Sequence, residues 1–451
     1  MMSSALAASR WLAVALLLAA TAVGVFNFRN IKYDFANFYD AGQKARAGEF
    51  AALYDPMAQI AGRDPFGNMS FASAPLTSYL YVPLTVLEPR PAVIAFKLAG
   101  AAAQLLALAL LFRETRGLAG SDPAHRRAYL AVFAWSALLF QPLYSWLFVG
   151  GQTTPFVFLL LVSAWMALLR GRDGLAALAM AAAVVIKPAF APAAVLVFVA
   201  TSNRFRIWAL AAGAGFVALS LTTLGPDVNL AFIDMVLNKA QEGNTPGQNS
   251  NPFAWVGPLL ARPDGFPSGP GPAGGMLVSL GLKLGTAALI LALLAGQIRA
   301  GLSRQAERHA VFAAAILLVI VLSPVVWSHY LSVLFLPFAV LIALRRHLPG
   351  WAAILFAAIL VLAVPQNFLV LMRLQREIPF DTPAVVLAVT FLKSLPALLA
   401  VIGVIALRQP ILSALADPAW SGVGRRDQRP PAASPLPPRR TGGRSPGTGS
   451  A

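Results

Sequence analysis

Four carboxylates crowd one short run of the sequence, KYDFANFYDAGQKARAGEFAALYDP, in a chain that has few acids elsewhere. They are Asp34, Asp40, Glu49 and Asp55. A positioned carboxylate can accept a proton as a general base, and Asp34, Asp40 and Asp55 could also gather in space around a divalent cation. Which chemistry they serve depends on where the rest of the chain holds them.

Two other ionisable residues stand out because their surroundings are apolar. Lys187 lies in VIKPAF, in a run otherwise without charge, and His329 lies in SPVVWSHY beside Trp327 and Tyr330. An ionisable group is costly in such a setting, which makes Lys187 a functional candidate. Each has a structural alternative, because Lys187 could extend its ammonium group to the surface and His329 could simply hydrogen-bond within a polar loop.

Uncharged polar residues form a third group of candidates. Gln152 lies in VGGQTTPF, and Asn249, Ser250 and Asn251 lie in GQNSNPFAW. Such side chains bind hydroxyl-rich ligands such as sugars, and they serve equally well as turn and cap residues. The sequence leaves both interpretations open.

Composition defines the class of protein that must position these residues. The chain is 58% hydrophobic and 12% charged and contains no cysteine, which is typical of a membrane protein and not of a soluble domain. The absence of cysteine excludes disulfides and thiolate chemistry. We therefore expect an integral membrane protein of the all-α class, a polytopic helical bundle.

Apolar runs of the required length predict its spans. Eight runs are long, and four shorter ones stop at a proline or a polar break. The shorter pairs predict two hairpins with tips at IKPAF and SPVVWSHY, giving about twelve passes; one long kinked helix at each site is the alternative. The first run resembles a signal peptide, but we expect an uncleaved anchor. The long runs are 11–28, 92–112, 128–148, 153–169, 207–224, 276–298, 351–371 and 384–407, and the short runs are 174–187, 188–200, 309–322 and 331–344.

Positive charge predicts the orientation, because Lys and Arg concentrate on the cytoplasmic side. Most arginines fall on the side of both termini, so the net charge of +17 is a topology signal and no nucleic-acid partner is expected. Lys97, Lys283 and Lys393 lie near enough to the ends of apolar runs to reach the surface. The predicted order is an anchor at 1–28, an outer loop at 29–91, membrane helices at 92–224, an outer loop at 225–275, membrane helices at 276–407 and a disordered basic Pro-rich cytoplasmic tail at 408–451.

The acidic run can now be placed in the first outer loop. Phe35, Phe38, Tyr39 and Gly42 follow the spacing of an amphipathic helix. We expect this helix to lie on the outer surface, to start at Asp34 close to the exit of the first span, and to end near Gly48. Asp34 would sit where lipid headgroups meet water, although a plain helix cap is an alternative role for it.

Several motifs in order carry a resemblance to a known family. They are YDFANFYDAGQKARAGEFAALYDP, SYLYVPLTVLEPRP, VGGQTTPF, VIKPAF, NSNPFAW and LSPVVWSHYLSVLFLP. Their order and placement resemble glycosyltransferase family 87, the DUF2029 group of C-type (GT-C) membrane enzymes. That group uses polyprenyl-phosphate sugars and includes mycobacterial phosphatidylinositol-mannoside mannosyltransferases. The resemblance runs from about residue 30 to residue 345.

The resemblance implies a role for individual residues. It implies that the catalytic carboxylate of the first outer loop is Asp34, and that Lys187 and His329 face the donor phosphate. It implies that Tyr39, Tyr54 and Asp55 shape the loop. Further substrate-binding candidates are Gln152, Asn249, Ser250, Trp327 and Tyr330.

The implied reaction is an inverting transfer of a hexose from a polyprenyl-phosphate sugar to a lipid or glycan acceptor, and mannose is the expected sugar. It would take place on the outer face of the bacterial inner membrane, among membrane lipids. Asp34 would act as base, and Lys187 and His329 would stabilise the departing phosphate. We expect no cofactor and no metal. A transporter or lipid flippase, and a scaffold for envelope assembly, are the alternatives from other classes.

Overall fold

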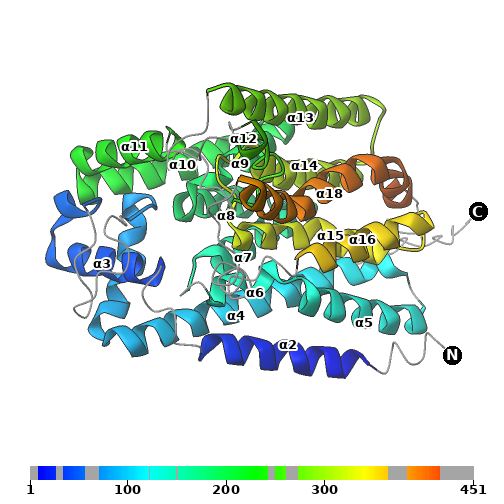
Figure 1. Ribbon diagram of the computed structural model, residues 1–451, viewed down its shortest axis with the longest axis horizontal. Coiled ribbons are helices and arrows are strands. Elements are labelled where there is room, and N and C mark those ends of the chain that lie inside the picture. Colours follow the sequence, from blue (N-terminus) through cyan, green and yellow to red (C-terminus); the bar gives the residue numbers. More distant parts are fainter. Residues whose placement is uncertain are drawn as a thin grey trace, which may run out of the picture.

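The computed structural model describes most of the chain, and its regular structure there is entirely helical (Figure 1). The predicted tail beyond residue 416, the loop at 372–382 and the segment at 27–33 lie outside the described residues. The described ranges are 9–26, 34–55, 71–120, 122–148, 151–241, 249–260, 273–363 and 383–416.

Five of the described helices are long and apolar enough to cross a membrane. They confirm that the chain is an all-helical membrane protein, whereas the number of twelve passes stays a prediction. The five are α4 (Pro89–Thr115), α10 (Asn203–Leu224), α13 (Ala273–Arg299), α14 (Arg304–Leu322) and α18 (Pro383–Ala416). Shorter helices complete the bundle: α2 (Arg10–Val25), α5 (Pro123–Leu139), α6 (Pro142–Phe148), α7 (Thr154–Leu169), α8 (Asp173–Ile186), α9 (Ala191–Ala200), α15 (Phe335–Leu344) and α16 (Gly350–Ala363).

The chain reverses between α8 and α9, as the hairpin prediction required. Lys187 has an extended backbone (φ −145°, ψ 93°), because the residue before a proline is excluded from the helical region. After α9 the chain returns to its starting level, where the Ser202 hydroxyl donates a hydrogen bond of 2.7 Å to Asp173 at the start of α8. The second predicted reversal joins α14 to α15 through residues 323–327 and the 3-10 helix η6 (Ser328–Leu334).

Two predicted boundaries are wrong, at 128–148 and at residue 408. The run 128–148 is split into α5 and α6, because Pro142 follows Gln141 and starts a new helix. The segment predicted as an outer loop, 225–275, contains α11 (Pro226–Gln241) and α12 (Val256–Leu260), and its place outside the membrane stays a prediction. The tail predicted from residue 408 begins later, because α18 continues through Arg408 to Ala416.

One end of the bundle collects arginines and is called here the arginine end. Arg170, after α7, pairs with Glu114 near the end of α4. Arg308 in the first turns of α14 donates a 3.2 Å hydrogen bond to the carbonyl of Leu169. These contacts place the ends of α4 and α7 beside the start of α14.

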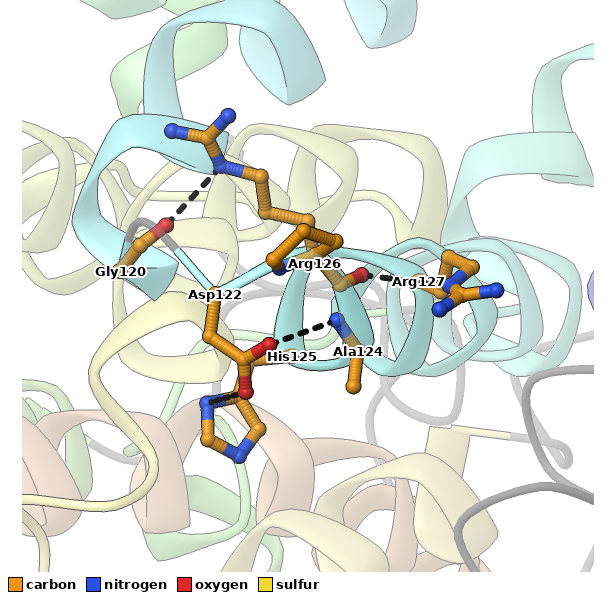
Figure 2. A network of polar contacts seen from close by, with 7 residues as sticks. Gly120, Asp122, Ala124, His125, Arg126 and Arg127 are labelled. Atoms are coloured by element: carbon orange, nitrogen blue, oxygen red, sulfur yellow. Dashed lines mark hydrogen bonds and ion pairs between the residues drawn. The ribbon is translucent and has the colours of Figure 1, made fainter.

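The start of α5 carries a further group of basic side chains (Figure 2). Asp122 caps the helix: its Oδ1 accepts a hydrogen bond of 2.9 Å from the Ala124 amide, and its Oδ2 lies 2.8 Å from His125 Nδ1. Arg126 donates to the carbonyl of Gly120 at 3.0 Å, and Arg127 to that of Pro123 at 3.4 Å. Short local contacts of this kind fix where α5 begins.

A small aromatic core holds α3 (Asp34–Ala47) against the bundle. It joins α3 to η1 (Phe50–Ala52), η2 (Pro75–Leu80), η3 (Val82–Val86) and the first turns of α4, and Figure 1 shows α3 at one end of the molecule. Phe96 is its hub, with ring centroids 5.6 Å from Phe35, 5.9 Å from Phe38, 6.0 Å from Tyr81 and 5.7 Å from Phe156.

The helix predicted from Asp34 to about Gly48 is confirmed. The predicted position of this helix on the outer surface is not confirmed. Residues 35–42 are all buried, including the polar Asn37 and Asp40, which lie off the predicted apolar stripe. Asp40 is paired with Lys44 at 2.9 Å. Gly42 allows this close packing, because a Cβ there would meet the backbone of Tyr81 at 2.9 Å.

Replacing Phe96 with Ala should destabilise the aromatic core by about 3–5 kcal/mol, as expected for a buried Phe that leaves a cavity. Leu98→Ala, on the exposed side of the same helix, is the matched control. The unfolding midpoint of the detergent-purified protein measures both. Equal midpoints for the two variants would show that the ring cluster does not hold α3.

Candidate functional site

Lys187 is the centre of a buried polar cluster at the end of the bundle away from the arginines. Its ammonium nitrogen lies 3.3 Å from Gln152 Oε1, 3.2 Å from Thr154 Oγ1 and 3.2 Å from His329 Nε2. It also lies 4.2 Å from the centre of the Tyr330 ring. A charged ammonium can only donate, so the contact with His329 requires an unprotonated Nε2. The side chain does not reach the surface and is 8% exposed.

Asp34 faces this cluster from the first turn of α3. Its carboxylate lies beside the Gln152 side chain, which favours the ionised form through hydrogen bonding, and it is attracted by the charge of Lys187. Burial raises the pKa of the Asp34 carboxyl group to about 6, against the lowering effects of the Gln152 hydrogen bond and of Lys187. Gln152 thus forms a bridge between the two groups, because it accepts from the ammonium group of Lys187 and lies beside the carboxylate of Asp34.

The bridge is positioned by the turn that precedes α7. Gly151 has a positive φ of +95°, a conformation that favours glycine, and a Cβ there would lie 3.1 Å from Phe96. The hub of the aromatic core therefore also packs against the turn that holds Gln152. In this way α3 and α7 are set relative to one another through a single ring.

The side of the cluster that contains His329 is positioned by the segment 249–251. Asn251 donates from Nδ2 to the carbonyls of Ile320 at 3.0 Å, Val321 at 3.1 Å and Ser323 at 2.9 Å. These are the orphan carbonyls at the end of α14. Asn249 accepts from the amide of Val326 at 2.9 Å, so the segment fixes the path of the chain into η6 and His329.

The predicted site residues therefore divide into two sets. Asp34, Gln152, Lys187, His329 and Tyr330 come together around the buried ammonium group. The other predicted residues have contacts of a structural kind, and their role in substrate binding stays a prediction.

The contacts of this second set are local. The Tyr39 hydroxyl donates to the carbonyl of Leu87 at 2.8 Å, and that of Tyr54 to Ser73 at 2.9 Å. Asn249 and Ser250 are fully buried against residues 324–326. Asp55 is exposed, and Trp327 is 36% exposed at the start of η6.

Two residues of the cluster were not among the sequence candidates. Thr154 belongs to the same VGGQTTPF motif as Gln152, and its position two residues later was the available signal. Lys393 in α18 is 3% exposed and close enough to His329 to act on it electrostatically. The expectation that Lys97, Lys283 and Lys393 reach the surface is wrong, because all three are buried.

The arrangement suits acid–base and anion chemistry. Asp34 offers a carboxylate whose pKa lies within about one unit of neutrality, a useful range for a general base. Lys187, with Lys393 nearby, offers positive charge in surroundings of low dielectric, where an anion is bound strongly. No group of three or more His, Asp or Glu side chains that could hold a metal occurs among the described residues, and independence from metals stays a prediction.

The fold and the site together define a helical membrane protein with a half-buried carboxylate, Asp34, and a buried cation, Lys187, at one end. The model of glycosyltransferase family 87 matches residues 71–328, more than half of the chain. The chain belongs to this family, and membership implies glycosyltransferase activity. The match includes Gln152, Lys187 and Trp327 but not Asp34 or His329. No curated protein matches the chain.

Replacing Asn251 with Ala should lower the free energy of unfolding by about 1–3 kcal/mol, because the buried carbonyls at the end of α14 lose their donor. Thr222→Ala is the control, since this exposed hydroxyl bonds only carbonyls of its own helix in the described structure. Chemical denaturation in detergent measures both variants. A loss no larger than that of the control would contradict the structural role of the segment.

Proposed function

We propose that the protein transfers a hexose, with inversion, from a polyprenyl-phosphate sugar to a hydroxyl group of a lipid or glycan acceptor. Mannose is the sugar favoured by the sequence resemblance. The observation that carries the proposal is the bridge Asp34–Gln152–Lys187, which holds a carboxylate and a buried cation on two sides of one polar residue. A base and an anion site are what this transfer needs.

The reaction follows from the charges of its participants. The Asp34 carboxylate accepts the proton of the acceptor hydroxyl while the hydroxyl oxygen forms a bond to the anomeric carbon. The bond from that carbon to the phosphate oxygen breaks, and its electron pair leaves with the phosphate. Attack from the side opposite to the leaving phosphate inverts the anomeric configuration. Because a phosphate is a weakly basic leaving group, no general acid is required.

Lys187 serves the leaving phosphate. Before the donor binds, its ammonium group is held by Gln152, Thr154 and His329. These neutral acceptors satisfy the cation without cancelling its charge, so an arriving phosphate gains a strong charge-assisted hydrogen bond. Lys393 and His329 extend the anion site on the side of α18. The nearby Tyr330 ring contributes a cation–π contact to Lys187.

Lipid-linked substrates explain the position of the site. Lys187 and His329 lie where α8 and α14 end, and both helices begin near arginines. The positive-inside rule then assigns the arginine end to the cytoplasm and the site to the outer face of the bacterial inner membrane. There the polyprenyl chain can stay in the bilayer while its phosphate enters the site.

Asp34→Asn should lower the rate of sugar transfer by about 10²–10⁴-fold, the contribution typical of a general base. The amide keeps the size of the side chain but cannot take the proton. Asp227→Asn, an exposed acid in the first turn of α11, is the control and should retain the activity. Labelled mannose transfer from polyprenyl-phosphate mannose to membrane lipid extract is measured with purified protein.

Equal rates of transfer by wild type and Asp34→Asn would show that Asp34 is not the base, while the glycosyltransferase activity itself would stand. If the wild type transfers no sugar from any of a panel of polyprenyl-phosphate donors, the proposed donor class is wrong. Movement of the intact lipid between leaflets without transfer would then favour a flippase.

The rate should also depend on pH through Asp34. The base works only when ionised, so kcat/KM should fall as pH decreases through about 6. Lys187 lowers the pKa of Asp34, so Lys187→Gln should move this acid limb to higher pH as well as slowing transfer. An acid limb that stays in place in Lys187→Gln would show that the two groups are not coupled.

A further inference from the structure

A cavity lies in a part of the bundle away from Lys187. It has a volume of about 110 Å³ and is lined by α13, α14, α15 and α18 together with Trp165 of α7. Its wall is almost entirely aliphatic; Leu294, Leu317 and Val340 are typical of it. Along α14 its wall runs from His309 to Leu317, and none of its lining residues belongs to the cluster around Lys187. The cavity is therefore distinct from the site around Lys187.

His309 gives this cavity an unusual polar feature. The side chain lines the cavity and is 6% exposed, and within the described structure neither of its ring nitrogens has a hydrogen-bond partner. Its ring packs against Trp165 at 5.4 Å between centroids. Buried polar atoms are nearly always paired, because a buried donor or acceptor without a partner has lost its hydrogen bonds to water. Two orphan nitrogens in a cavity wall indicate a ligand that supplies their partner.

Arg408 supplies positive charge to the same cavity. It lines the wall from α18, its Nη1 donates to the carbonyl of Ile405 at 2.8 Å, and its buried Nε has no partner in the described part of the chain. Gln297 adds a third polar side chain, from the last turns of α13. Because Arg299 and Arg304 are only a few residues from Gln297 and His309, these polar groups lie towards the arginine end.

The size and lining of the cavity define the occupant. A water-sized group needs about 10–15 Å³ of such volume, so the cavity accepts a chain on the order of eight methylene groups. A guanidinium and an imidazole at a membrane-facing basic end fit a phosphate headgroup. We propose that this pocket binds one acyl chain of an anionic phospholipid, with Arg408 and His309 holding its phosphate.

Binding of dioctanoyl-phosphatidylglycerol to the purified, delipidated protein tests the proposal. The wild type should bind it at least tenfold more tightly than dioctanoylglycerol, which has the same acyl chains but no phosphate. Inorganic phosphate at the same concentrations should not compete. Equal binding of the two lipids would overturn the role of the headgroup, and competition by phosphate alone would show that the ligand is a free anion.

Variants then locate the lipid. Arg408→Gln should weaken phosphatidylglycerol binding at least tenfold, whereas Arg346→Gln, an exposed arginine near the end of α15, should change it less than twofold. If the two substitutions weakened binding equally, the lipid would be attracted by surface charge in general, and the proposed binding in the pocket would be overturned. His309→Phe keeps the aromatic contact with Trp165 and removes the orphan nitrogens. This variant should be at least as heat-stable as wild type without lipid and should lose most of the stabilisation that the lipid gives; full lipid stabilisation of His309→Phe would contradict the proposal.

Discussion

The burial of one ammonium group constrains the rest of this structure. Removing an unpaired charge from water costs several kcal/mol even after relaxation, so Lys187 must be met by acceptors at hydrogen-bond distance. Those acceptors come from the turn before α7 and from η6, far apart in the sequence. The bundle therefore has to bring these segments to one point, and the aromatic core and the segment 249–251 are the parts that do so.

The neutral character of these acceptors gives the site its chemistry. If a carboxylate sat directly on Lys187, the pair would neutralise itself and bind anions poorly. Here Gln152 stands between Asp34 and Lys187, so the base and the cation influence each other while both stay available. Family 87 membership and this separation of charges support the same reaction, in which one group takes a proton and the other receives a leaving phosphate.

The sequence predicted those parts of the molecule that depend on local rules. Apolar run length and proline breaks placed most helices and both chain reversals, and the cost of a charge in an apolar run identified Lys187. It failed where tertiary contacts decide. Asn37 and Asp40 lie off the predicted apolar stripe of α3 but are buried, and Lys393 was expected at the surface but is buried close enough to His329 to act on it electrostatically. Nothing near Asn249 along the chain reveals that its partners lie more than seventy residues away.

The central claim is that a donor phosphate lies against Lys187 while Asp34 faces the opposite side of the sugar. A cryo-EM structure of the protein with a non-hydrolysable polyprenyl-phosphonate sugar tests it directly. The account predicts phosphonate oxygens within about 3 Å of Lys187 Nζ and the Asp34 carboxylate across the anomeric carbon from them. A donor bound with its phosphonate at the arginine end, or with Asp34 and Lys187 on the same side of the sugar, would contradict it.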